Sequence, residues 1–178
     1  DIDANDPRAQ AVTTWFATLD GCDRVADIGC GSGRFLRLLA NQDESRNLIG
    51  IEPALECNHQ LAPRVEHRTG GLLHLPAADA EFDAAFAVES LEHALVPQTA
   101  IAELCRVVRP GGHLLIIDKN ALLQPLSEHA PWERWFHPEE VCRWLWRHCD
   151  HVQVTPLHDP SHPKKKPTFL AWHGRRKL

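Results

Sequence analysis

The loop Asp27-Ile-Gly-Cys-Gly-Ser-Gly33 constrains the fold of this chain more than any other stretch. A short apolar run ends in Asp27, and glycines then occupy alternate positions before an apolar-periodic run from Arg34 to Ala40 (Gly29, Gly31, Gly33). This pattern predicts a strand, a tight turn and a helix. Glycine permits positive φ at the turn and lets a ligand approach the backbone, while the free N–H groups at a helix start favour an anion.

A second acid, Glu52, follows at the end of the next predicted strand. Leu48-Ile-Gly-Ile-Glu52 is predicted as a second strand, and Glu52 comes nineteen residues after Gly33. In a doubly wound sheet, an acid at the end of the second strand binds the hydroxyls of a ribose. A dinucleotide-binding loop places its third glycine one residue later than this chain does. The two acids therefore favour a nucleoside ligand over a tight turn that binds nothing.

The rest of the chain alternates helical and extended patterns, which is typical of an α/β fold. We expect helices at residues 6–19, 33–41, 96–108 and 138–148, and another that begins at Pro53. We expect strands at residues 24–28, 48–51, 65–68, 82–88, 113–117, 152–155 and 168–172, the last two as a hairpin. The Arg109-Pro-Gly-Gly112 stretch is predicted to end the helix at residues 96–108, with two glycines in the left-handed conformation.

Length and composition indicate one domain over residues 1–178. No apolar run is long enough to span a membrane and no signal peptide is visible, so we expect a cytoplasmic protein. The six cysteines form no Cys-x-x-Cys pair, which favours reduced thiols. The chain contains no Met, so we expect the natural protein to extend further at its N-terminus or to be processed.

The charge is unevenly distributed along the chain. Residues 1–159 hold 13 basic and 24 acidic residues, a net charge of −11, whereas every charged residue beyond Asp159 is basic. An acidic body argues against broad binding of nucleic acid, and the basic tail leaves a small opening for it.

From about Arg24 to Ile117 the chain resembles a class I S-adenosylmethionine-dependent methyltransferase, of the small-molecule group called methyltransferase type 11. Besides the glycine loop, the resemblance rests on four motifs in the family's order and spacing: Gly50-Ile-Glu-Pro53, Leu75-Pro76 with Phe82-Asp83, Leu91-Glu-His93 and Arg106-Val-Val-Arg-Pro-Gly-Gly112. It implies a single-domain α/β fold with a doubly wound, seven-stranded, mostly parallel sheet, one antiparallel strand and helices on both faces. The cofactor-binding core would span about 22–118, and a variable cap and hairpin region about 119–178.

The resemblance also implies roles for residues around the cofactor, S-adenosylmethionine, whose product is S-adenosylhomocysteine. The methionine part would be held by Asp27, Gly29, Cys30, Gly31 and Gly33, and Glu52 would bind ribose. Pro53, Ala54, Leu72 and Leu73 would flank adenine, while Val88 and Glu89 would line the methyl-transfer end. Where the family commonly has an Asp that contacts the adenine amino group, this chain has Gly71, so we expect weaker cofactor binding.

The acceptor side is less defined. Methyl transfer from a sulfonium mainly needs positioning, and a base is useful only when the nucleophile must lose a proton. His93 is the candidate base; the alternative is a histidine bonded to backbone at a helix start. An aromatic segment is the candidate substrate cap, or else a loop packed on the sheet (Trp132, Trp135, His137). Trp15 and Phe16 either border the cofactor pocket or pack in the core, and core packing is favoured.

We predict methyl transfer to an O, N or C atom of a small molecule. One alternative is an RNA or protein methyltransferase guided by basic clusters at Lys164–Lys166 and Arg175–Lys177; another is an inactive cofactor-binding domain of a larger protein. The chain holds oxygen ligands that suit Mg²⁺ (Glu89, Asp118, Asn120) and residues that suit zinc (Cys142, His148, Cys149, His151), but neither metal site is predicted. The sequence predicts no oligomeric state.

Overall fold

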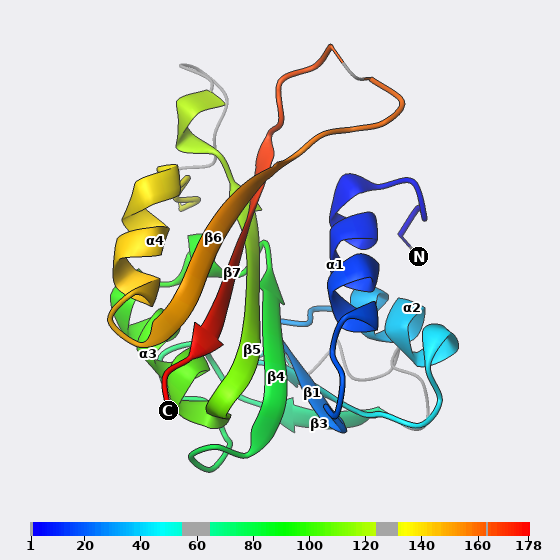
Figure 1. Ribbon diagram of the computed structural model, residues 1–178, viewed down its shortest axis with the longest axis vertical. Coiled ribbons are helices and arrows are strands. Elements are labelled where there is room, and N and C mark those ends of the chain that lie inside the picture. The colour runs from blue at the N-terminus through cyan, green and yellow to red at the C-terminus, as the bar shows by residue number, and fades with distance from the viewer. Residues whose placement is uncertain (1, 55–64, 124–131, 163) are drawn as a thin grey trace.

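The computed structural model describes residues 2–54, 65–123, 132–162 and 164–178 (Figure 1). Seven strands form one sheet in the order β3-β2-β1-β4-β5-β7-β6. Neighbouring strands are parallel from β3 to β5, and β7 runs antiparallel to both β5 and β6. The strands are β1 (Arg24–Ile28), β2 (Asn47–Glu52), β3 (Glu66–Thr69), β4 (Phe82–Val88), β5 (Val108–Lys119), β6 (Cys149–Leu157) and β7 (Phe169–Arg176). The predicted sheet, with its one antiparallel strand, is confirmed.

Helices cover both faces of this sheet, as predicted (Figure 1). One face carries α1 (Pro7–Ala17) and α2 (Arg34–Gln42), and the other carries α3 (Pro97–Val107) and α4 (Pro138–Leu145). Two short 3-10 turns, η2 (Leu91–His93) and η3 (Ala121–Leu123), follow β4 and β5. None of the helices in the described part of the chain is long and apolar enough to cross a membrane.

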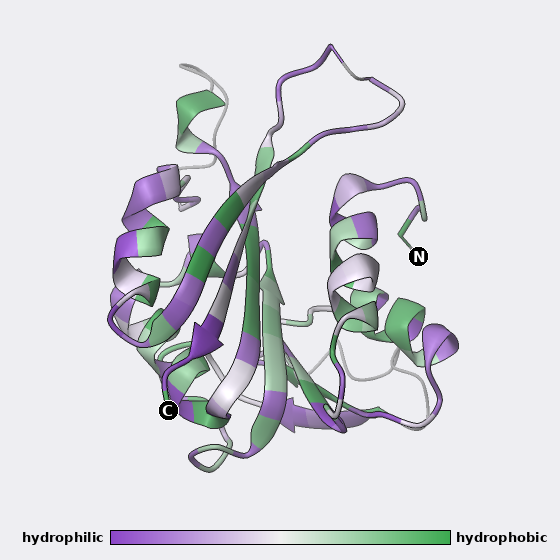
Figure 2. Cartoon of the chain, in the orientation of Figure 1, coloured by the Kyte–Doolittle hydropathy of each residue, from purple (hydrophilic) through white to green (hydrophobic). Residues whose placement is uncertain are grey.

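The apolar periodicity explains how these helices pack. On α2, the buried residues recur every three to four positions, so that one stripe meets the sheet (Phe35, Leu36, Leu39, Ala40). On α1, Trp15 and Phe16 are buried, and Trp15 meets Phe86 of β4 edge to face at 5.8 Å. Both residues belong to the buried apolar cluster on this face of the sheet, as favoured by the sequence. Figure 2 shows hydrophobic colour along the central strands and hydrophilic colour in the long β6–β7 loop.

The predicted helix exit at residues 109–112 is wrong. Helix α3 ends at Val107, and Val108 already pairs with Phe82 as the first residue of β5. Only Gly111 of the two glycines has a positive φ, 73°. Gly112 is required for another reason, because a Cβ there would lie 2.5 Å from the carbonyl oxygen of Asp83 on β4. Residues 109–112 thus form an irregularity within a strand, where two backbones approach closely.

The ends of the later elements also differ from the prediction. Helix α4 ends at Leu145 instead of residue 148, and both β6 and β7 are longer than expected. Strand β6 lies at the sheet edge and five of its nine residues are exposed, so its sequence lacks the continuous apolar run of a central strand. The helix predicted from Pro53 falls largely on residues 55–64, outside the described residues.

Candidate functional site

The glycine loop lies at the carboxyl end of β1, where the strand order reverses between β1 and β4. Its glycines all have positive φ: 76° at Gly29, 50° at Gly31 and 74° at Gly33. A Cβ on Gly29 would lie 2.4 Å from Cβ of Ser90, whereas Gly31 has no atom within 4 Å of such a Cβ. Gly29 is therefore required by packing, and Gly31 leaves backbone open to a ligand. A topological switch point is where open α/β sheets bind ligands.

Glu52 ends β2 beside this loop, as the sequence predicts. Its Oε2 accepts a hydrogen bond from the Gly31 N–H at 3.0 Å, and its Oε1 accepts one from the Ala54 N–H at 3.1 Å. These two bonds fix the carboxylate, and each oxygen keeps a lone pair for another donor. A pair of adjacent hydroxyls, such as those of a ribose, suits a carboxylate held in this way.

Asp27 is the unusual acid of the site. Its side chain is 1% exposed, and no described residue donates a hydrogen bond to its Oδ2. Burial raises the pKa of Asp27 well above its ordinary value; the Arg34 guanidinium opposes this shift and the Glu52 carboxylate adds to it. A buried acceptor without a partner is costly, and such groups are uncommon in folded proteins. The vacant acceptor fits a ligand that carries an N–H or ammonium donor.

Two adjoining hollows surround the loop. The first, about 520 Å³, is lined by Gly29, Gly31, Glu52, Pro53, residues 70–73 and Glu89, and also by Ile28, Ser90, His93, Ala94 and Leu95. The second, about 270 Å³, is lined by residues 29–32, Arg34, Phe35, Val88 and Glu89. Together they collect nine of the twelve predicted cofactor residues; Asp27, Gly33 and Ala54 do not line either hollow. A larger hollow, about 870 Å³, lies between α1 and the β6–β7 pair, but no residue of the glycine loop lines it. The residues that line them therefore favour the two smaller hollows, not the largest one, as the candidate cofactor site.

An ion-pair network that the sequence did not predict joins α1 to this site. Glu89 has a φ of 51°, and its N–H donates to the Ile117 carbonyl at 2.8 Å. Its carboxylate pairs with Arg34 at 2.7 Å and with Arg8, and Arg8 also pairs with Asp6 at 2.5 Å. The position of Arg34 near the site could have been predicted, because it directly follows the glycine loop. No local sequence pattern indicates that Arg8 lies there. The network places two guanidinium groups at the carboxyl end of β4.

A buried acid pair lies beside the first hollow. Glu92 of η2 is 3% exposed and Asp118 of β5 is 0% exposed. Burial, and then the neighbouring Glu92 carboxylate, raise the pKa of Asp118 well above its ordinary value. The Lys119 Nζ lies 3.1 Å from Oε1 of Glu92 and 2.8 Å from Oε2 of Glu133, while Oε2 of Glu92 has no partner among the described residues.

His93 lies between this acid pair and the hollow. Its side chain is 51% exposed, it lines the first hollow, and its Nε2 lies 3.4 Å from Oε1 of Glu92. An imidazole with one nitrogen facing a carboxylate keeps its other nitrogen for a proton from a ligand.

Among the described residues, the three predicted as a cap do not line either hollow (Trp132, Trp135, His137). Trp132 is 73% exposed, and His137 is an exposed residue that precedes α4. Trp135 is half-buried, and its ring centroid lies 5.9 Å from Nζ of Lys119, the lysine that contacts the acid pair. Among the three candidates, Trp135 is therefore the one linked to the acid pair, through its contact with Lys119.

Other candidate clusters are separated by the fold. Lys164–Lys166 precede β7 and Arg175–Lys177 end it, so that the eight-residue strand separates them by roughly 25 Å. They do not form one basic surface. Over residues 2–54, 65–123, 132–162 and 164–178, no group of three or more His, Cys, Asp or Glu side chains could hold a metal ion.

Comparisons with known proteins agree with this geometry. A family model described as "Methyltransferase domain" matches residues 26–116, just over half of the chain. The O-methyltransferase resE of Aspergillus sclerotiorum is 35% identical over 127 residues, which cover 67% of this chain and 44% of that protein. The ubiquinone biosynthesis O-methyltransferase of Alkalilimnicola ehrlichii is 29% identical over 163 residues, covering 80% of this chain and 66% of that protein.

The fold is also similar to that of a solved S-adenosylmethionine-dependent methyltransferase from Thermotoga maritima, described as a possible histamine N-methyltransferase. The TM-score is 0.76 at 23% identity, with 98% of this chain and 89% of that chain covered. The chain spans less than half the length of several curated relatives, between 38% and 46%. The region that the family model matches holds the glycine loop, Asp27 and Glu52. The chain belongs to the methyltransferase-domain family, among the class I S-adenosylmethionine-dependent methyltransferases.

Proposed function

We propose that this protein transfers a methyl group from S-adenosylmethionine to an oxygen atom of a small-molecule acceptor. The observation that carries the proposal is the single hollow lined by Gly31, Glu52 and His93 beside the buried, unpartnered Asp27. The O-methyltransferases among the relatives support oxygen as the atom that is methylated. When bound, S-adenosylmethionine supplies an electrophilic methyl group on a sulfonium centre.

The chain's own residues bind and orient this cofactor. Asp27 accepts a hydrogen bond from the ammonium of the methionine part, which gives its orphan oxygen a partner. Glu52 holds the ribose hydroxyls, and the backbone from Gly29 to Gly33 passes close to the ligand because no Cβ intervenes. Pro53, Leu72 and Leu73 contact the adenine. Val88, Cys30 and Glu89 bound the adjoining hollow at the methyl-transfer end.

His93 takes the proton of the acceptor hydroxyl. Glu92 faces one imidazole nitrogen and stabilises the charged ring that forms when the other nitrogen accepts the proton. Lys119 and Glu133 hold Glu92 in place, since Lys119 contacts both carboxylates. A base of this kind is needed for a hydroxyl acceptor, whose neutral oxygen is a poor nucleophile, and is of less use for an amine.

Two measurements test the proposal. Isothermal titration with S-adenosylhomocysteine measures cofactor binding, and release of S-adenosylhomocysteine from S-adenosylmethionine measures turnover against panels of phenols, carboxylates and amines. We expect binding, turnover with hydroxyl acceptors, and at least a tenfold loss of turnover in His93→Ala with unchanged cofactor affinity. Wild-type protein that binds neither form of the cofactor would refute the proposal.

The same panels separate the alternatives. Binding without turnover on any acceptor would favour a cofactor-binding domain that acts within a larger protein. Turnover on RNA, with affinity that falls steeply as salt rises, would favour a nucleic-acid substrate. The two basic clusters at opposite ends of β7 do not favour that substrate.

A further inference from the structure

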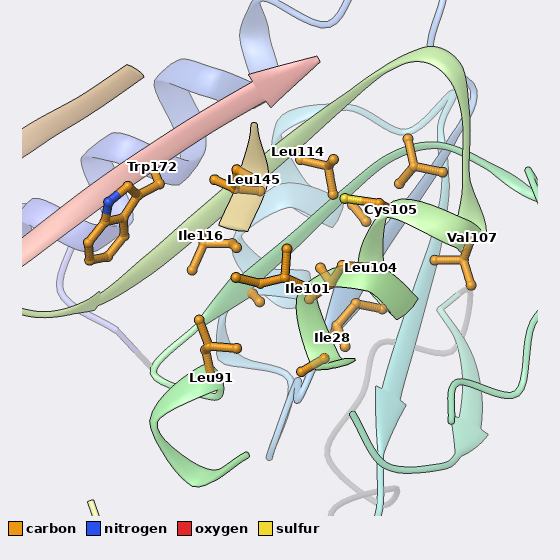
Figure 3. Close-up of a cluster of buried hydrophobic side chains, with 14 of the residues drawn as sticks. Ile28, Leu91, Ile101, Leu104, Cys105, Val107, Leu114, Ile116, Leu145 and Trp172 are labelled. Atoms are coloured by element: carbon orange, nitrogen blue, oxygen red, sulfur yellow. The ribbon is translucent and has the colours of Figure 1, made fainter. Parts of the chain in front are cut away.

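Two cysteines that are far apart in the sequence meet in the core beside α3. Cys105 lies on α3 and Cys149 begins β6, and their Sγ atoms are 3.7 Å apart although 44 positions separate the residues. Both side chains are buried, and Figure 3 shows the Cys105 sulfur next to Leu114. Because a disulfide has an S–S distance of about 2.05 Å, the two sulfurs need to approach by only about 1.7 Å to bond.

A cavity reaches Cys105, one member of this pair. It measures about 420 Å³ and is lined by Cys105, Ala102 and five basic residues (Arg106, Arg147, His148, Arg176, Lys177). No acidic residue lines it within the described part of the chain. Arg176 and Lys177 are fixed in place, since each donates to backbone carbonyls, Arg176 to that of Arg106 at 2.9 Å and Lys177 to that of Trp146 at 2.7 Å.

The two thiols share a hydrogen bond in which either sulfur can be the donor. The Cys105 thiol hydrogen bond lowers the pKa of Cys149, and the Lys177 and Arg176 cations act in the same direction against burial. The same hydrogen bond, together with burial, raises the pKa of Cys105. The thiolate is the nucleophilic form of cysteine, and nearby cations stabilise it. The contact between the two sulfurs and the cations beside them therefore favour oxidation of this pair.

We propose that Cys105 and Cys149 form a reversible oxidation site, which a small hydroperoxide entering through the basic cavity converts into a disulfide. One thiolate attacks the peroxide oxygen, the O–O bond breaks, and the departing alkoxide or hydroxide takes a proton. The sulfenic acid that results is attacked by the second thiol, which forms the S–S bond and releases water. The two thiols lose two electrons in total, and the peroxide gains them.

The disulfide would tie α3 to the first residue of β6, outside the hollows beside the glycine loop. No residue that lines the basic cavity also lines those hollows. We therefore expect cofactor affinity to change less than twofold on oxidation. The melting temperature should rise by several degrees, because the cross-link closes a long loop in the unfolded chain.

The test uses hydrogen peroxide on the reduced protein, followed by alkylation in denaturant, intact-mass measurement and peptide mapping. We expect a loss of two alkylated thiols, a linked peptide that joins Cys105 to Cys149, and full recovery of both thiols with dithiothreitol. Folded wild-type protein in which both cysteines remain alkylated, or acquire only added oxygen, would overturn the proposal.

Variants give the matched comparison. Cys142→Ser removes a buried thiol of the same face and should keep the cross-link, whereas Cys105→Ser and Cys149→Ser should abolish it. If either serine variant fails to fold, the linked peptide of the wild type decides the question alone. Arg147→Glu, in the cavity lining, should slow oxidation severalfold, and Arg143→Glu, on α4 outside the lining, should not. Equal rates in these two variants would overturn the assigned route.

Discussion

Acidic side chains at the two ends of the parallel strands differ in their contacts. The amino edge is the side of the sheet where the parallel strands begin, and the carboxyl edge is the side where they finish. At the amino edge, Asp83 of β4 accepts from the N–H groups of Asp23 and Arg24 at 2.9 Å each and from Nε of Arg109 at 2.6 Å. Glu81, just before β4, pairs with Arg24 and Arg68. At the carboxyl edge, Asp27 and Glu92 each keep a buried oxygen without a partner among the described residues.

The pKa values follow the same division. The hydrogen bond from Arg68 lowers the pKa of Glu81 to about 2, whereas burial raises the pKa of both Asp27 and Asp118. Acids at the amino edge thus contribute to folding through contacts that are already complete. Asp27, Glu92 and Asp118 at the carboxyl edge are held at a cost in folding free energy, which is typical of positions prepared for a ligand or a reaction. Glu52 and Glu89 lie at the same edge but have partners, so the contrast applies to the fully buried acids.

The largest effect is expected at Asp27. Replacement with Ala removes the acceptor proposed for the cofactor's ammonium, and affinity for S-adenosylhomocysteine should fall at least a hundredfold, about 2.7 kcal/mol. The free energy of unfolding should stay the same or rise, because an unpartnered buried acceptor is lost. Titration calorimetry and urea unfolding on the same preparation measure both quantities. An unchanged affinity would place Asp27 among the structural acids.

Asp83 is the matched control at the other edge. In Asp83→Ala, three donors lose their acceptor, and the free energy of unfolding should fall by about 2 kcal/mol. Cofactor affinity per folded molecule should not change. A variant that is as stable as the wild type, or that binds cofactor more weakly when fully folded, would break the proposed division between the edges.

The pH dependence of stability should differ in sign between the edges. Glu81, with a folded pKa near 2 against an ordinary 4.5, stabilises above pH 4.5, and this contribution is lost as pH falls toward 2. Asp118, with a raised folded pKa, destabilises increasingly as pH rises above its ordinary 3.8. In urea unfolding at several pH values, Glu81→Gln should flatten the acid loss. Asp118→Asn should instead raise stability near neutral pH. The same response in both variants would show that the edges do not differ.

The smallest effect is expected in the aromatic segment. Trp135 packs against Lys119 beside the acid pair, so Trp135→Ala should raise the acceptor KM or lower kcat, by about 1 kcal/mol in kcat/KM. Trp132 is mostly exposed, and Trp132→Ala should change kcat/KM by only a few tenths of the effect of Trp135→Ala. Cofactor affinity should be unaltered in both variants. Equal effects at the two positions would mean that the segment closes over the acceptor as a whole.

Much of the fold could be predicted from local patterns. Apolar runs that lead to Asp27, Glu52 and Glu89 predicted three strands, because the backbone preference of each run is short-range. The family resemblance implied that these strands lie in a mostly parallel sheet. The glycine loop was predicted with its positive φ angles. The prediction failed at residues 109–112, where Pro and two glycines are typical of a helix exit. Close approach to β4, which no local pattern contains, placed them in a strand instead.

By itself, the sequence determined the order of strands and helices, the loop that opens the backbone at Gly31, and the acids that follow the strands. These features depend on residues within about ten positions of one another. Only the tertiary structure decided which distant residues meet. The side chains of Arg8 and Glu89 pair, the Glu92 N–H donates to the Asp118 carboxylate, and the sulfurs of Cys105 and Cys149 are in contact, although these pairs are 81, 26 and 44 positions apart. Each contact requires two elements to pack side by side, and that packing follows from burial of the whole apolar core, to which every strand and helix contributes.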